Sequence, residues 1–131
     1  SLDALIRSSA CPIITQHNDS NADVTSSLGG PNHHVLFDAS GGRGKLPGGW
    51  PARLQDKALC GYAGGLGPGN IQFELPRIFA AAGSQPFYID MESSLRDSSD
   101  RFSFPLVRSV LSGIELAIEN IILPTPSKEA A

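Results

Sequence analysis

Residues 33–38 form a short apolar run that ends in a single carboxylate, Asp38, and a glycine-rich loop with two cations follows at once. Short apolar runs bounded by turn residues are typical of buried strands. Parallel strands of α/β proteins carry their chemistry at their carboxyl ends. We therefore expect Asp38 at the carboxyl end of a buried parallel strand, beside the space that the glycines of the loop leave open.

Apolar runs alternate with helical patterns along the chain. The patterns predict strands at residues 11–17, 33–38, 58–63 and 85–90, and helices at residues 1–10, 22–28, 70–82 and 104–122. Alternation of this kind is typical of a parallel sheet with helical crossovers. The loops after the last three strands should then share one edge of the sheet.

Several positions between these elements carry weaker signals. Residues 51–57 are expected to form a connector or a short helix, and Pro76 to kink the helix around it or to delay its start. Cys60 is expected in the core, Trp50 as a packing anchor, and His33 and His34 in structural roles. In the last helix we expect an apolar face that is buried, made of Leu106, Val107, Val110, Leu111, Ile114, Ala117, Ile118 and Ile121.

Composition excludes several classes of protein. The chain has 131 residues, of which 40% are hydrophobic and 18% charged, which predicts one globular domain, at residues 1–123, and a flexible tail at 124–131. The net charge is −3 and no basic stripe is present, which argues against nucleic acid as a partner. The two cysteines show no metal spacing, and no apolar run is long enough for a membrane span. We expect a cytoplasmic protein without a metal, a cofactor or a membrane partner.

Two further loops contain small residues that favour anion binding. Gly64 and Gly65 precede a predicted helix, where unpaired N–H groups attract phosphate, although an ordinary tight turn has the same composition. Ser93 and Ser94 follow the last strand and offer hydroxyl and amide donors. Loops after the last two strands of eight-stranded barrels commonly bind phosphate, so the two loops together fit that arrangement better than either one alone.

Charged and titratable side chains complete the set of candidates. Asp38 is a candidate general acid or base, or alternatively caps its own loop. Asp90, at the end of the last strand, either orients a substrate group or orders its loop. Arg43 is a candidate contact to an acidic substrate but equally a solvated cation, and His17 ends the first strand at the same edge.

Three segments in this order resemble phosphoribosylanthranilate isomerase, a family of (β/α)8-barrel enzymes of tryptophan biosynthesis. Residues 35–50, with Asp38 before a Gly-Gly-Arg-Gly-Lys loop and Trp50, resemble the family's strand 6 segment. Residues 63–71 and 89–95 are similar to its strand 7 and strand 8 segments. Differences from the family pattern occur at Arg43, which stands in place of Thr, at residues 48–49 in place of Phe-Asp, and at residues 92–96.

The resemblance implies a fold and a chemistry. The chain would be the C-terminal half of a (β/α)8 barrel, with four parallel βα units that correspond to strands 5–8. Asp38 would be the general acid that opens the furanose ring before an Amadori rearrangement of N-(5-phosphoribosyl)anthranilate. Substrate and phosphate would be held by residues of the three loops: Gly41, Gly42, Gly64, Gly65, Asp90, Ser93 and Ser94.

A half-barrel of this family would lack the general base, which is a cysteine on strand 1. We therefore expect no isomerase activity from this chain alone. Its exposed strand edges should pair with a missing N-terminal half or with a second copy. Alternatives are a sugar-phosphate-binding module without turnover and another phosphate-binding barrel enzyme.

Overall fold

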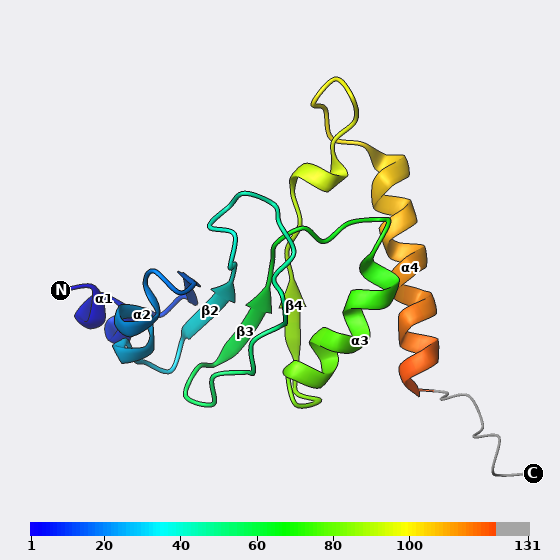
Figure 1. Cartoon of the computed structure of the whole chain (residues 1–131). Coiled ribbons are helices and arrows are strands. Elements are labelled where there is room, and N and C mark those ends of the chain that lie inside the picture. Colours follow the sequence, from blue (N-terminus) through cyan, green and yellow to red (C-terminus); the bar gives the residue numbers. More distant parts are fainter. Residues whose placement is uncertain (123–131) are drawn as a thin grey trace, which may run out of the picture.

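The computed structural model describes residues 1–122 (Figure 1). Its elements are α1 (Leu2–Ser8), β1 (Ile13–His17), α2 (Ala22–Ser27), β2 (His33–Phe37), β3 (Leu59–Tyr62), α3 (Ile71–Ala81), β4 (Phe87–Ile89), the 3₁₀ helix η1 (Ser93–Leu95) and α4 (Phe104–Ile122). The four strands form one sheet in the order β1-β2-β3-β4, and all three pairings are parallel. The predicted α/β fold with a parallel sheet is confirmed. The tail expected at 124–131 lies outside the described residues.

The four strands end at the same level. The register pairs His17 with Phe37, Phe37 with Tyr62, and Tyr62 with Ile89, and these are the last residues of their strands. The residues that follow each strand therefore emerge side by side at the carboxyl edge of the sheet. This confirms the expectation that the loops share one edge.

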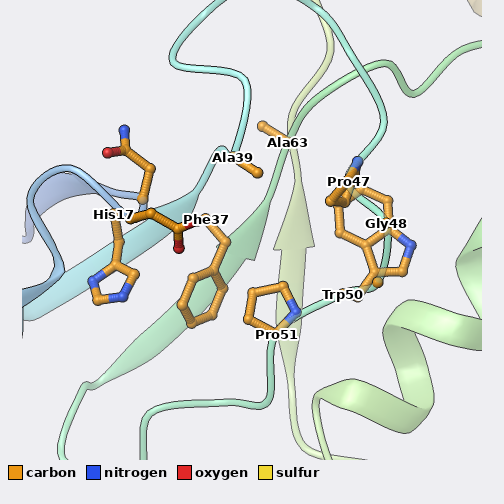
Figure 2. Close-up of a pocket in the computed structure, with 11 residues that line it drawn as sticks. His17, Phe37, Ala39, Pro47, Gly48, Trp50, Pro51 and Ala63 are labelled. Atoms are coloured by element: carbon orange, nitrogen blue, oxygen red, sulfur yellow. The ribbon is translucent and has the colours of Figure 1, made fainter.

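The connection between β2 and β3 contains no helix in the described structure. Residues 38–58 cross over as a glycine- and proline-containing loop, so residues 51–57 form the expected connector and not a short helix. The Lys57 ammonium group is buried and donates hydrogen bonds to Leu28 O (2.7 Å) and Ser26 O (3.3 Å), which ties the connector to the end of α2. A cavity lies between the connector and the ends of β1 and β2 (Figure 2).

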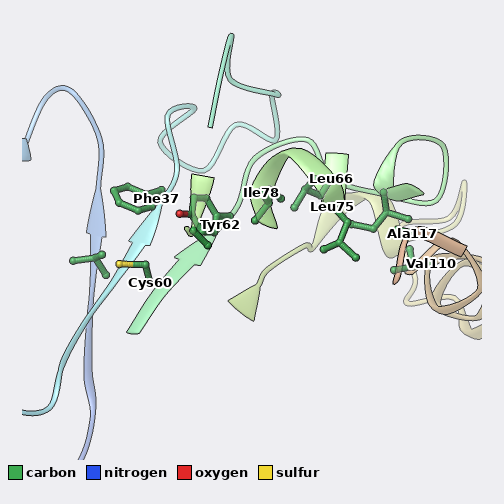
Figure 3. Close-up of a cluster of buried hydrophobic side chains, with 11 residues drawn as sticks. Phe37, Cys60, Tyr62, Leu66, Leu75, Ile78, Val110 and Ala117 are labelled. Carbon is green, nitrogen blue, oxygen red and sulfur yellow. The ribbon is translucent and has the colours of Figure 1, made fainter. Parts of the chain in front are cut away.

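The hydrophobic core lies between one face of the sheet and the helices α3 and α4 (Figure 3). Val35, Phe37, Cys60 and Tyr62 project from β2 and β3, and alternate residues of a strand point to one face. The cluster also contains Leu66, Ile71, Leu75, Ile78 and Ala82 in and around α3, and Val110 and Ala117 of α4. The burial of Cys60 is as expected, and Trp50 packs against Tyr62 as the expected anchor, with ring centroids 5.9 Å apart.

The helix α3 begins at Ile71 and runs through Pro76, so the alternative of a start delayed beyond the proline is wrong. Pro76 is tolerated because the helix is held from both sides, by the sheet and by α4.

The helix α2 covers the same face of the sheet as α3. His17 and His33 point to this face, and their rings contact α2 at Thr25 Oγ1 (2.6 Å) and the residue after it at Leu28 O (3.2 Å). His33 is fully buried and also bonds Thr15 Oγ1 at 2.9 Å, so its expected structural role is confirmed.

The opposite face of the sheet is not covered by any described element. Its side chains alternate with those of the core: Ile14 is 55% exposed, Gln16 is exposed, and Leu36 and Tyr88 are half-buried. Tyr88 lies across Gly61, where an added Cβ would be 2.1 Å from the ring, and its hydroxyl donates to Val35 O at 3.0 Å. Parallel sheets normally have both faces covered. This sheet therefore presents one unpartnered face and two unpaired edges, at β1 and β4.

The helix α4 has the predicted bounds but not the predicted burial. Val110 and Ala117 are buried, whereas Leu111 is 55% and Ile118 43% exposed, so their expected burial is wrong. Ile118 lines an apolar groove that α4 forms with α3 and β4, and this groove is left open. None of the helices described has the length and apolar character that a membrane span requires.

Candidate functional site

A cavity of about 470 Å³ lies at the carboxyl edge of the sheet. It is lined by residues from the three predicted loops: Asp38, Gly42 and Gly44 after β2, Ala63, Gly64, Gly65 and Leu66 after β3, and Asp90, Met91, Glu92, Ser93, Ser94, Arg96 and Asp100 after β4. The level ends of the strands bring these loops together. The proton donor candidate and both small-residue loops therefore share one cavity.

Asp38 is a buried carboxylate with four hydrogen-bond donors around it. Oδ2 accepts from Gln16 Nε2 (2.8 Å) and from the amide of Gly42 (2.7 Å). Oδ1 accepts from the amide (3.1 Å) and the hydroxyl (2.7 Å) of Ser40. Burial acts to raise the pKa of this carboxyl, but the hydrogen bonds outweigh burial, and the pKa is lowered. In the described chain Asp38 is thus held in its ionised form.

The glycine loop after β2 is organised by Asp38 itself. The Gly41 amide donates to Asp38 O at 3.1 Å, and the Gly42 amide donates to the side chain. The amides of Gly41 and Gly42, both predicted substrate contacts, are therefore already hydrogen-bonded within the protein. Gly41 also does not line the cavity. Arg43 is exposed and bonds Ser40 O through Nε (2.8 Å), so the structure does not bring its guanidinium to the cavity either.

Gly64 and Gly65 allow two loops to touch. Both have positive φ angles, 111° and 67°. A Cβ on Gly64 would lie 2.7 Å from Lys45 O, and one on Gly65 would lie 2.4 Å from Leu46 N. The backbone of the preceding loop therefore packs directly on these glycines, a requirement that the sequence pattern alone does not distinguish from close approach of a ligand.

Backbone amides of the two small-residue loops remain available to a ligand at the cavity. Within residues 1–122, the N–H groups of Gly64, Gly65, Ser93 and Ser94 donate no hydrogen bond to the protein. The hydroxyl of Ser94 is occupied, because it donates to Leu66 O at 2.5 Å and so joins the last two loops. Ser93 is exposed at the cavity wall. The donors that fit an anion here are thus mainly backbone amides.

Charges around the amides are mixed. Arg96 is the one cationic side chain among the described residues that line the cavity, and it pairs with Glu92 (2.8 Å) and Asp100 (3.4 Å). Asp90 lines the cavity as an exposed carboxylate. These carboxylates do not converge, because within the described residues no three His, Cys, Asp or Glu side chains are placed to hold a metal ion. An anion at the amides would be attracted by Arg96 and repelled by its neighbours.

His17 lies at the predicted edge but outside this cavity. Its ring bonds Thr25 Oγ1 and packs edge-on against Phe37, with centroids 5.2 Å apart, and it lines the separate cavity of Figure 2.

Three residues that matter at the main cavity were not singled out from the sequence. Ser40 could have been found, because a serine two residues after an aspartate favours a local Asx turn. Gln16 and Arg96 reach the site only through strand register and loop folding.

Comparison with known proteins identifies no relative: no family model, curated protein or solved structure matches this chain significantly.

Proposed function

We propose that this chain is the sugar-phosphate-binding half of a (β/α)8 barrel similar to phosphoribosylanthranilate isomerase. The observation that carries the proposal is the shared cavity, in which Asp38 and the free amides of the loops after β3 and β4 face one space. A phosphate held by the amides near Gly65 and Ser93 would leave the sugar within reach of Asp38. The chemistry proposed for the complete enzyme is an Amadori rearrangement of an aminosugar phosphate.

The uncovered sheet face supports a half-barrel. All described helices that contact the sheet lie on one face, and the other face carries partly exposed apolar side chains such as Ile14 and Leu36. In a closed barrel this inner face packs against itself and both unpaired edges find a strand. The exposed side of α4, at Leu111 and Ile118, would be covered by the neighbouring unit of such a barrel.

The arrangement of helices favours a distinct complementing half over a second copy. The helix α1 precedes β1 and α4 follows β4 (Figure 1). If β4 of one copy paired with β1 of another, α4 and the second copy's α1 would both occupy the groove outside that strand pair. A module of four strands and three helices, beginning and ending with a strand, closes the barrel without this duplication. We propose that such a module supplies the missing general base.

A second candidate function is binding of a sugar phosphate without turnover. It is favoured by the hydrogen bonds that keep Asp38 ionised, because a general acid must first carry a proton. In a completed barrel the inner face would lose its water, and this added burial would act to raise the pKa of Asp38 toward the range of a general acid. The two functions therefore differ in whether the completed barrel turns the sugar phosphate over or only binds it.

Phosphate binding by the chain is tested by titrating ¹⁵N-labelled protein with ribose 5-phosphate and, separately, with inorganic phosphate. We expect saturable shifts of the amide signals of Gly64, Gly65, Ser93 and Ser94. Ser93→Glu places a negative charge at the cavity wall and should abolish these shifts, whereas Ser98→Glu adds the same charge outside the cavity and should leave them. Shifts scattered over the surface, or equal in both variants, would refute the proposed site.

Turnover is tested on a longer chain, in which the proposed complementing module of four strands and three helices precedes residue 1. The extended chain should isomerise the phosphoribosyl-anthranilate substrate, and Asp38→Asn should abolish turnover while phosphate binding persists. Phosphate binding without turnover in the extended chain would support the binding module instead.

A further inference from the structure

The second cavity, of about 280 Å³, lies on the helix-covered face of the sheet, apart from the carboxyl-edge site (Figure 2). It occupies the place where the crossover between β2 and β3 would carry a helix. The connector that replaces the helix bends over the ends of β1 and β2 and leaves a space between itself and the sheet. Its volume is at the lower end for ligand sites, which suits a molecule with one ring.

Ring side chains from the sheet and from the connector face each other across this cavity. His17 and Phe37 line it from the sheet, and Trp50 and Pro51 line it from the connector. The rings are held firmly: Trp50 Nε1 donates to Glu74 Oε2 at 2.8 Å, and Tyr62 packs between Phe37 and Trp50 with centroid distances of 5.3 and 5.9 Å. A ligand therefore meets preformed ring faces and does not have to order them.

The charge at the rim selects the kind of ligand. Asp19 is the only charged residue that lines the cavity within residues 1–122, and it is exposed at the opening. Burial lowers the pKa of His17, so its ring is neutral at neutral pH. Aromatic faces together with one carboxylate attract a cation and disfavour an anion.

We propose that this cavity binds a small aromatic or cyclic amine, with the ring between His17, Phe37 and Trp50 and the ammonium group toward Asp19. This site is a cavity distinct from the proposed sugar-phosphate site, and the two cavities are neighbours that share Ala63 in their walls. An amine here would contact the connector directly and hold it against β1 and β2.

Trp50 is the only tryptophan of the chain, so its fluorescence and its indole ¹H–¹⁵N signal come from one known residue of this cavity's wall. We expect phenethylamine to change both signals saturably, 2-phenylethanol to bind at least fivefold more weakly, and phenylacetate to bind most weakly. Absence of a saturable response to phenethylamine overturns the proposal. Equal or tighter binding of phenylacetate overturns the assignment of the ammonium to Asp19.

Glycines supply matched variants for this test. Gly48 is an exposed residue of the cavity wall where an added Cβ meets nothing within 4 Å, so Gly48→Leu should fill the opening of the cavity and weaken phenethylamine at least tenfold. Gly69 is equally open but lies away from the cavity, so Gly69→Leu should bind as the parent does. Gly49→Leu serves as the second filling variant if the first fails to fold. Parent-like binding by a folded filling variant overturns the proposal.

Discussion

Oδ2 of Asp38 accepts the amide N–H of Gly42 at 2.7 Å, so the glycine loop after β2 folds back onto the carboxylate that precedes it. Gly41 and Gly42 have φ angles of 60° and 84°, which the reversal requires and which side chains disfavour. The loop and the carboxylate therefore form one unit. Whatever Asp38 does for a ligand, it first orders the loop that borders the cavity.

Replacing Asp38 with Asn should destabilise the chain by about 2–3 kcal/mol, because hydrogen bonds to a buried charge are lost and an amide donor is placed against other donors. Urea unfolding at pH 7 measures the loss. The pKa of Asp38 is lowered, so its contribution is present above its unfolded value of 3.8 and is lost as the pH falls through the folded value. The gap between parent and variant should therefore close below pH 3.8. Asp23→Asn, at an exposed position, should change stability little, and a gap that is constant with pH would contradict this account.

Buried Tyr62 and half-buried Tyr88 should respond differently to loss of their hydroxyl groups. Within residues 1–122 the Tyr62 hydroxyl has no hydrogen-bond partner, so Tyr62→Phe should be neutral or stabilise by about 1 kcal/mol. The Tyr88 hydroxyl donates to Val35 O at 3.0 Å, so Tyr88→Phe should cost about 1 kcal/mol. Burial raises the pKa of both hydroxyls to about 12, so neither ionises at the pH of the experiment. Chemical unfolding of the two variants measures both changes in stability. Equal losses of stability would show that the Tyr62 hydroxyl has a hydrogen-bond partner.

Gly65→Ala should destabilise the chain strongly, by about 3 kcal/mol or more, because its φ angle is 67° and the new Cβ would lie 2.4 Å from Leu46 N. Gly69→Ala is the matched change at an open position without a positive φ angle and should be nearly neutral. Thermal unfolding compares them. Similar midpoints would mean that the loop after β2 does not rest on Gly65.

Glu92→Gln should strengthen phosphate binding about fivefold, because it removes a carboxylate from the cavity and releases Arg96 from a 2.8 Å ion pair. The size follows from about 1 kcal/mol for two unit charges about 4 Å apart in water, which surrounds the exposed Glu92 side chain. Glu115→Gln on α4 makes the same charge change away from the cavity and should leave the affinity unaltered. Calorimetric titration with inorganic phosphate measures both, and an equal gain in both variants would indicate an effect of net charge only.

Stability should also fall as the pH drops below about 6.5, because burial lowers the pKa of His33 in the folded chain relative to that value. The unfolded chain takes up the proton first, so unfolding becomes easier until the folded pKa is reached. His33→Gln should remove this part of the pH dependence, at a cost in stability at neutral pH. Equal stability of the parent chain at pH 7 and pH 5 would argue against this role of His33.

The order of elements and the edge of the sheet that carries the candidate site were determined by the sequence alone. Alternating patterns predicted the strands that end near Phe37, Tyr62 and Ile89, and parallel strands must end at one edge. Asp38, Gly64 and Ser93 were therefore expected at one place, and the structure brings them to one cavity.

What each group does there was decided by the tertiary structure. Periodicity does not reveal that the backbone of Lys45 lies on Gly64, that Ser94 donates to Leu66 O, or that Gln16 reaches Asp38 from the neighbouring strand. It predicts an apolar side of α4 but not whether a neighbour covers it, so Leu111 and Ile118 are exposed where burial was expected. The physical reason is that a local pattern records which groups avoid water or favour a turn, whereas distances between segments remote in the chain arise only when strands pair and loops pack.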